Sequence, residues 1–307
     1  FETIFYSLHK NYSISSHPEI TLEANPDDLT PDYIAMLRTL PFNRLSMGIQ
    51  TFNESILKVL QRRHTARQAI EAFQNCRAAG FQNISIDLMY GLPGETLSTW
   101  QQDLDQALLL HPEHLSAYHL IYEEDTVLWK LREQHKVEEA DEDLSVSLFS
   151  TLIDRLTSEG YDHYEISNFS LPGLYSRHNS SYWTEKKYLG CGPSAHSYNG
   201  VSRQWNVASL DTYIKGISAG TPVFEIEELD LYTRYNDFVI TRIRTEWGMP
   251  LSKLRDEFGE KLYDYCLRMA APHLKQGTLE LVNDILKLTR KGIFISDGIM
   301  SDMLWTD

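Results

Sequence analysis

Residues 84–94 have the sequence ISIDLMYGLPG and contain the strongest fold signal in the chain. A short run of apolar, β-prone residues meets a cluster of glycine and proline, which is typical of a buried strand that runs into a turn. Three further segments have the same pattern and also stop at polar or turn-forming residues: 20–26, 44–50 and 114–119. Patterns of helical length separate them. We therefore expect right-handed βαβ units and a parallel sheet, an α/β fold.

Three polar side chains lie near the carboxyl ends of these predicted strands: Glu23, Gln50 and Asp87. Ligands of such sheets bind beyond the carboxyl ends of the strands, so the three are expected to face one site. A single acid or amide at a strand end is more often a helix cap or a turn residue. Two carboxylates and a carboxamide can together hold an amine and the two hydroxyls of a ribose.

Four motifs resemble one known family. They are LEANP at 22–26, LSMGIQTF at 45–52, QRRH at 61–64 and DLMYGLPG at 87–94. They look like the oxygen-independent coproporphyrinogen III oxidase group of radical S-adenosylmethionine (SAM) proteins. The resemblance implies a partial (β/α)6 radical SAM barrel.

The same resemblance implies a set of SAM-binding residues. Glu23 would bind the SAM amino group, Arg62 its carboxylate, and Gln50 and Asp87 its ribose hydroxyls, with backbone near Ile121 beside the adenine. The planar guanidinium of Arg62 matches a carboxylate with two hydrogen bonds. The alternative for Arg62 is an arginine on a helix surface.

The family also carries an N-terminal Cys-x3-Cys-x2-Cys loop that holds a [4Fe-4S] cluster, and this loop does not occur in the sequence. Its three cysteines, Cys76, Cys191 and Cys266, lie far apart and have no metal-ligand spacing, so no residue here is assigned to a metal. Residues 1–8 read as the middle of a helix without a cap. We therefore expect the cluster segment and the first strands of the barrel to precede residue 1.

Composition and charge exclude several protein classes. The chain has 307 residues, of which 42% are hydrophobic, enough for a barrel and smaller additional units. A formal charge of −15 argues against nucleic-acid or anionic-membrane binding. No apolar run reaches the roughly 18 residues of a transmembrane segment. Few, unpaired cysteines suit a reducing, cytoplasmic location.

We expect three parts: a partial barrel over residues 1–160, an aromatic and glycine-rich connecting and cover region over 161–229, and an accessory domain over 230–307. Helical patterns at 231–247, 251–258 and 261–275 and a hairpin around 283–284 predict a winged-helix-like shape for the last part. From residue 230 onward the chain has 11 Lys and Arg against 12 Asp and Glu, without a basic stripe. A DNA-binding role is therefore not expected.

Residues 177–183, RHNSSYW, combine a possible metal ligand with flat aromatic side chains. Iron porphyrin requires both. The alternative is that Tyr182 and Trp183 pack against the barrel while His178 and Asn179 hydrogen-bond the loop. The motif His-Asn-x-x-Tyr-Trp, with the glycine-rich turn at 190–197, resembles the HemW-type branch of the family, the haem chaperones.

This branch implies that His178 contacts the haem iron and that Asn179, Tyr182 and Trp183 shape the haem site. The favoured function is a haem chaperone that delivers haem to apoproteins such as respiratory cytochromes or oxidases, with SAM and the cluster serving assembly or regulation. The alternative is coproporphyrinogen III dehydrogenase, which uses a 5'-deoxyadenosyl radical to decarboxylate two propionates. A weaker third reading is a binding module without a cluster. His178 favours the chaperone, because only the chaperone needs a haem ligand.

Overall fold

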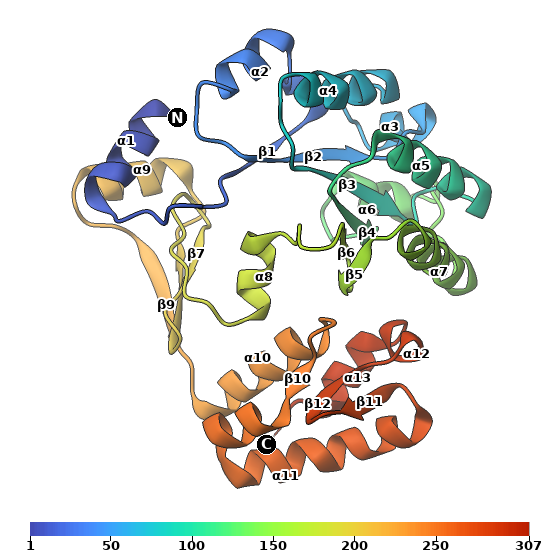
Figure 1. The fold of residues 1–307 in the computed structure, drawn as a ribbon, viewed down its shortest axis with the longest axis vertical. Coiled ribbons are helices and arrows are strands. Elements are labelled where there is room, and N and C mark those ends of the chain that lie inside the picture. The colour runs from blue at the N-terminus through green and yellow to red at the C-terminus, as the bar shows by residue number, and fades with distance from the viewer. Residues whose placement is uncertain (307) are drawn as a thin grey trace. The chain divides into compact units, whose positions relative to one another are not determined.

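The computed structural model describes residues 1–306, which form two compact units that divide between Ser176 and Arg177. The first unit is built on a six-stranded sheet with the order β1-β2-β3-β4-β6-β5 (Figure 1). Its strands are β1 (Thr21–Ala24), β2 (Arg44–Gln50), β3 (Ile84–Tyr90), β4 (His114–His119), β5 (Asp162–Glu165) and β6 (Asn168–Ser170). The first four are parallel, and β6 pairs with β4 in the antiparallel direction. The four predicted strands and the α/β fold class are confirmed.

Most helices of this unit connect strands and lie on one side of the sheet, whereas the first helix precedes β1 and lies apart from them (Figure 1). The helical elements of this unit are α1 (Glu2–Asn11), η1 (Pro26–Asp28), α2 (Pro31–Leu37), α3 (Glu54–Val59), α4 (Ala66–Ala78), α5 (Leu97–Leu110), α6 (Val127–Glu133) and α7 (Glu142–Ser158). Side-chain caps fix several of their starts: Thr65 and Thr96 form capping boxes, and Asp141 accepts from Leu144 N–H. These three helices therefore begin where the sequence supplies an oxygen for their first N–H groups, whereas α1 and η1 have no side-chain cap.

The two faces of the parallel sheet differ in chemistry. Alternate residues face opposite sides of a strand. The helix-covered face carries fully buried apolar side chains, which are Leu45, Met47, Ile49, Ile84, Ile86, Leu88, Leu115 and Ala117. The other face carries polar residues that are also buried: Arg44, Ser46, Ser85, His114 and Ser116. Buried polar groups need hydrogen-bond partners, and a polar ligand can provide some of them. We therefore expect a polar ligand to bind on this side of the sheet.

The second unit contains two three-stranded sheets and several helices. One sheet has the order β7-β8-β9, and the other has the order β10-β12-β11. The strands are β7 (His196–Tyr198), β8 (Ser202–Asn206), β9 (Phe224–Glu228), β10 (Met249–Pro250), β11 (Leu279–Val282) and β12 (Ile285–Leu288). The helices are α8 (Arg177–Trp183), α9 (Leu210–Ser218), α10 (Leu231–Ile243), α11 (Leu251–Gln276), α12 (Arg290–Ile293) and α13 (Ser296–Met303).

The predicted hairpin and the helices of the C-terminal part are present. The two helices expected at 251–258 and 261–275 form one element, α11, which is kinked at Gly259 with a φ of 79°. In the first unit the β5–β6 hairpin extends the sheet beyond residue 160, where the barrel was expected to end. The division into three parts at 160 and 229 stays a prediction.

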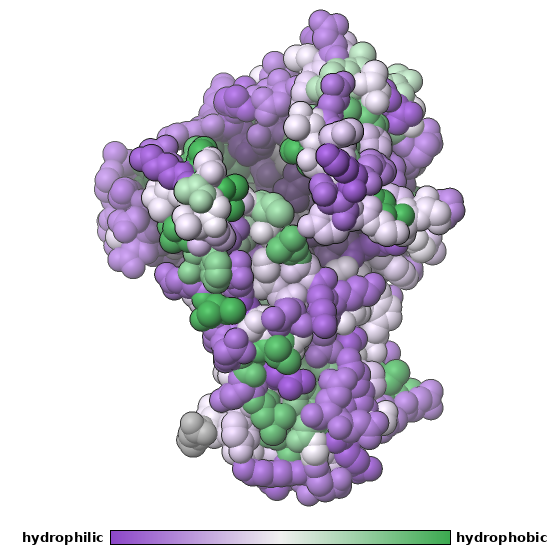
Figure 2. Space-filling model, turned by 90° about the vertical axis from the view of Figure 1, so that its left-hand side faces the viewer, coloured by the Kyte–Doolittle hydropathy of each residue, from purple (hydrophilic) through white to green (hydrophobic). Residues whose placement is uncertain are grey.

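Hydrophilic residues cover most of the face shown in Figure 2, with apolar residues in scattered groups. This agrees with the strongly acidic composition. Within residues 1–306, no helix has both the length and the apolarity that crossing a membrane requires.

Two buried acids stabilise the turns beside the sheet. Glu95 Oε2 accepts hydrogen bonds from the N–H groups of Gly91, at 2.6 Å, and Leu92, at 3.2 Å, while its Oε1 is buried without a partner. Burial raises the pKa of Glu95 to about 7. Burial also raises the pKa of Asp103, on α5, to about 6. These carboxyls therefore bind protons more tightly in the folded than in the unfolded chain.

Because the pKa of Glu95 is higher in the folded chain than in the unfolded chain, its contribution to stability decreases as the pH rises. Its favourable contribution is fully present below the unfolded pKa of 4.5 and is lost as the pH rises through about 7. We expect Glu95→Gln to stabilise the protein at pH 8 by about 2 kcal/mol, and the gain to vanish near pH 4, below the unfolded pKa. Urea unfolding between pH 4 and 8 measures this, with the exposed Glu123→Gln as control. Parallel curves for wild type and Glu95→Gln would contradict it.

Candidate functional site

The parallel register brings the predicted acids together. Glu23 of β1 pairs with Ser46 of β2, and Asp87 of β3 pairs with Gly48 of β2 and Ser116 of β4. Ser46 Oγ donates to Asp87 Oδ1 at 3.4 Å. Both carboxylates therefore face the polar side of the sheet.

Burial and the neighbouring side chains change the pKa of Asp87. Burial raises it to about 6, and the negative charge of Glu23 adds to the increase. The nearby hydroxyl of Ser116, the hydrogen bond from Ser46 and the charge of Arg44 act in the opposite direction. Asp87 is thus ionised at neutral pH and can accept hydrogen bonds from hydroxyl groups, but it loses this capacity below about pH 6.

The side chains of Gln50 and Arg62, two of the predicted SAM-binding residues, approach each other at Gly48. A Cβ placed on Gly48 would lie 3.0 Å from Gln50 Nε2, 3.5 Å from Arg62 Nη2 and 3.8 Å from Asn25 Oδ1. The absence of a side chain at this position lets an amide and a guanidinium approach the same point of the backbone. Gln50 and Arg62 are therefore brought together, as the SAM assignment requires.

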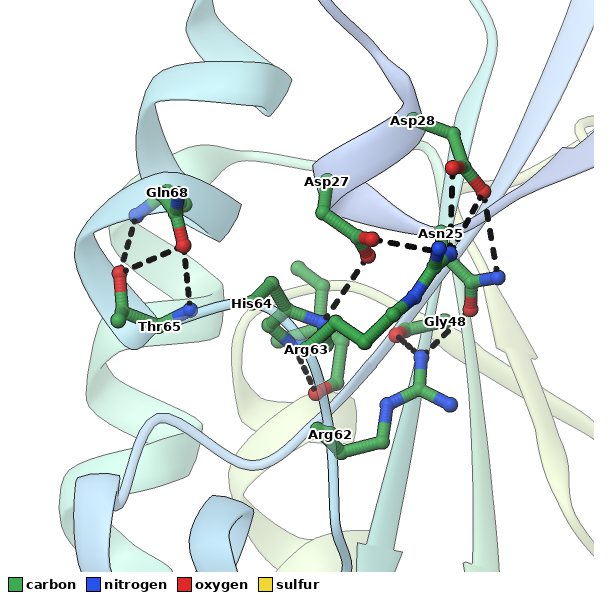
Figure 3. A network of polar contacts seen from close by, with 10 residues as sticks. Asn25, Asp27, Asp28, Gly48, Arg62, Arg63, His64, Thr65 and Gln68 are labelled. Atoms are coloured by element: carbon green, nitrogen blue, oxygen red, sulfur yellow. Dashed lines mark hydrogen bonds and ion pairs between the residues drawn. The ribbon is translucent and has the colours of Figure 1, made fainter.

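Arg62 follows α3 and points to the ends of β1 and β2 (Figure 3). Its Nη2 donates at 2.7 Å both to Asn25 Oδ1 and to the carbonyl oxygen of Gly48. Its Nε is buried without a partner. The arrangement differs from a surface arginine. Because both hydrogens of Nη2 are used, a carboxylate ligand would be held through Nη1 or Nε.

Two long-range contacts hold the backbone on either side of Gln50, whose φ of 71° is unfavourable for a residue with a side chain. The ring of His64, which is buried, contacts the carbonyl oxygen of Ile49 at 3.1 Å through Nε2. Asp103 accepts from Thr51 Oγ1 at 2.5 Å and from the N–H of Phe52 at 2.8 Å. These contacts fix the direction of the Gln50 side chain.

The residues next to Arg62 tie its loop to η1. Arg63 pairs with Asp27 at 2.9 Å and with Asp28 at 3.2 Å (Figure 3). Burial lowers the pKa of His64, so its ring is neutral at pH 7 and its Nε2 can donate to the carbonyl of Ile49. Sequence reasoning did not identify these supporting roles. The motif QRRH contained the relevant signal, because it places three polar side chains in a row, Arg62, Arg63 and His64. Each of them contacts a different part of the chain.

Ile121 follows β4 and its side chain is 75% exposed. The preceding N–H, of Leu120, donates to Tyr90 O at 2.8 Å and fixes the end of the strand. Over residues 1–306 the backbone N–H and C=O of Ile121 have no hydrogen-bond partner. The position fits a backbone contact to an adenine at the same edge of the sheet.

The described residues do not fit an iron–sulfur cluster. Cys76 and Cys266 are fully buried, and burial raises their pKa values to about 12 and about 11. Cys191 is exposed, and none of the three is in a disulfide. Between residues 1 and 306 there is no group of three potential metal-ligating side chains. That this chain supplies no cluster ligand stays a prediction.

In the second unit, α8 brings two members of the His-Asn-x-x-Tyr-Trp motif together. His178 Nε2 and Tyr182 OH lie 3.0 Å apart, and their rings are perpendicular with centroids 5.0 Å apart. Both side chains are exposed, and Asn179 is half-buried. Trp183 is placed differently: the Arg244 guanidinium lies 4.2 Å from its ring centroid, and its Nε1 is buried without a partner.

The glycine-rich turn at 190–197 has a structural explanation. Asn206 Nδ2 donates to the carbonyl oxygens of Gly190, at 3.4 Å, and Gly192, at 2.9 Å. A Cβ on Gly190 would collide with the carbonyl oxygen of His196. His196 itself stacks against Trp205, and both residues line a cavity of about 330 Å³. The turn therefore positions a second exposed histidine, which sequence reasoning gave no role.

Comparisons with known proteins agree with this architecture. Residues 1–107 match the Radical SAM superfamily, and residues 229–295 match the HemN C-terminal domain. The chain is 31% identical to heme chaperone HemW of Lactococcus lactis, covering 100% of this chain and 80% of that protein. Heme chaperone HemW of Bacillus subtilis is 30% identical, with 93% of this chain and 76% of the relative covered.

Among solved structures, coproporphyrinogen III oxidase (HemN) from Escherichia coli matches with a TM-score of 0.82 and 22% identity. The match covers 98% of this chain and 73% of that one, and at this identity it shows the fold alone. The predicted radical SAM fold and the predicted branch are both confirmed. The chain belongs to the radical SAM superfamily and, within it, to the HemW family.

Proposed function

We propose that this protein is a haem chaperone that binds haem at α8 and SAM on the polar face of the first unit's sheet. One observation carries the haem assignment: His178 and Tyr182 stand together on an exposed surface of α8, within the motif that distinguishes the branch. The relatives named heme chaperones match this chain over most of its length. Apoproteins that need haem are the proposed acceptors.

The residues of α8 and of the segment after it fit an iron porphyrin. The ring centroids of Tyr182 and Tyr188 lie 4.9 Å apart at an interplanar angle of 75°, so the two rings offer an aromatic face and an aromatic edge near the imidazole of His178. Such surfaces pack against a macrocycle, while the imidazole is a common axial ligand of haem iron. Because His178 Nε2 contacts Tyr182 OH, that hydroxyl would turn aside if Nε2 were the ligand. Asn179 and Trp183 would set the position of α8 below the macrocycle.

The SAM assignment uses the side chains gathered around Gly48. Glu23 would accept from the amino group, Gln50 and Asp87 would hold the ribose hydroxyls, and Arg62 would bind the carboxylate through Nη1 or Nε. The backbone of Ile121 would pair with the adenine. When bound beside an iron–sulfur cluster, SAM supplies a 5'-deoxyadenosyl radical, but the chaperone proposal requires binding alone.

The haem assignment predicts the outcome of a hemin titration followed by Soret absorbance. We expect saturable binding by the wild type and at least about tenfold weaker binding, or a lost ligand signature, in His178→Ala. His196→Ala is the matched control, because His196 is another exposed histidine of the same unit. Circular dichroism verifies the fold of both variants.

Each other outcome has a distinct meaning. Binding lost in His196→Ala but kept in His178→Ala would move the iron ligand to the cavity beside Trp205. A wild type that does not bind hemin would refute the chaperone proposal. Product analysis with coproporphyrinogen would then test the enzymatic alternative.

The SAM assignment predicts a loss of affinity in Asp87→Asn, because the neutral amide has one acceptor oxygen instead of two and lacks the charge that strengthens hydrogen bonds from hydroxyl groups. Calorimetry of SAM binding at pH 7.5 should show a loss of about 1 to 3 kcal/mol. Gly48→Ala should also weaken binding, since its Cβ would lie only 3.0 Å from Gln50 Nε2 and push that side chain aside. Asp105→Asn, on the exposed side of α5, is the control. Unchanged affinity in both site variants would refute the assignment.

A further inference from the structure

A cavity of about 160 Å³ opens beside Tyr182 within the second unit. Four elements or their flanking segments form it, α8, β7, β8 and α10, and α10 contributes three residues from one of its faces. The lining residues are Tyr182, Glu185, Tyr188, Tyr198, Arg203, Arg234, Asp237 and Thr241. The cavity is too small for a porphyrin macrocycle but has room for a short carboxylate arm.

The charges of the lining leave one cation unmatched. Asp237 is bonded to Arg203. Glu185 pairs with Arg242 at 3.0 Å and with Lys253 at 2.7 Å. Arg234 has no ion-pair partner in the part of the chain that the structure describes.

A row of aromatic rings connects the cavity with the proposed iron ligand. Ring centroids are 5.0 Å apart between His178 and Tyr182, 4.9 Å between Tyr182 and Tyr188, and 6.1 Å between Tyr188 and Tyr198. The last three of these residues line the cavity. Propionate arms project from the edge of a haem macrocycle. A macrocycle bound at His178 beside this row would therefore carry a propionate toward the cavity that Arg234 lines.

We propose that this cavity binds one propionate carboxylate of haem, with Arg234 as its charge partner. The proposal rests on haem binding at α8 and adds a determinant of ligand choice. A guanidinium offers a carboxylate two parallel hydrogen bonds in addition to charge attraction. Burial raises the pKa values of Tyr188 and Tyr198, so both hydroxyls keep their protons. The hydroxyl of Tyr188 can donate to the same carboxylate, whereas that of Tyr198 donates to the carbonyl oxygen of Gly200 at 3.4 Å.

The acidic residue Asp237 of the lining should affect carboxylate binding in the opposite direction to Arg234. Burial, with the charges of Glu227 and Glu185, raises the pKa of Asp237, while Arg203 lowers it. An entering carboxylate competes with Asp237 for Arg203 and is repelled by the charge of Asp237. Asp237→Asn should therefore strengthen binding of a ligand with propionates, although Arg234→Gln weakens it.

The test compares hemin with hemin dimethyl ester, in which both propionates are esterified and uncharged. Wild type should bind hemin about tenfold more tightly than the ester, and Arg234→Gln should remove most of this preference by weakening hemin alone. Arg268→Gln, an exposed arginine on α11 outside the cavity, removes the same charge and should keep the preference.

The outcomes separate this proposal from haem binding itself. Equal affinities of wild type for hemin and the ester, with normal hemin binding, would overturn the propionate site and leave the chaperone proposal intact. Loss of both ligands in His178→Ala, with the preference retained in His196→Ala, would support both proposals. No hemin binding by wild type would end both. If Arg234→Gln fails to fold, the two ligands on wild type and on Asp237→Asn still decide the question.

Discussion

The alternation of apolar and polar side chains along β2, β3 and β4 sets the architecture of the first unit. One face is apolar and is buried by helices, which drives folding through the removal of apolar surface from water. The opposite face is polar and buried, so its groups must find partners. A chain of contacts supplies them: His114 joins Ser85 at 2.8 Å and Tyr164 at 2.6 Å, and Ser116 donates to Asn168 at 3.0 Å. The hairpin that carries Tyr164 and Asn168 thus supplies hydrogen-bond partners to the buried polar face of the sheet.

Near the carboxyl ends of the same strands, some polar groups, such as Nε of Arg62, have no hydrogen-bond partner and could bind a ligand. Gln50 adopts a backbone conformation with positive φ, and such conformations persist when the surrounding contacts outweigh their cost. His64 on one side and Asp103 on the other provide those contacts. Arg62 has one nitrogen fully engaged and another buried without a partner. The scaffold therefore holds the polar groups in place before a ligand arrives, which lowers the ordering cost of binding.

The sequence predicts the strands and the position of Glu23 and Asp87 because both follow from local periodicity and from the direction of parallel strands. It does not predict the groups that support Gln50, because their partners are 15 residues away for His64 and 51 for Asp103 along the chain. The β5–β6 hairpin also escapes prediction, since its short strands lack an apolar alternation. For α8 the motif predicts which residues matter, but local pattern gives no indication that Trp183 packs under Arg244 while Tyr182 faces His178.

The two proposed sites differ in exposure, and the difference follows from what each ligand must do. Asp87 lies among buried serines, in surroundings that raise its pKa and suit a cofactor that stays bound. His178 and Tyr182 are exposed, so a porphyrin held there keeps one side open to an acceptor. Transfer also requires affinity that is sufficient without being excessive. A single unmatched arginine and an exposed imidazole supply two moderate contacts that an acceptor can replace one after the other, whereas a closed pocket would have to open first.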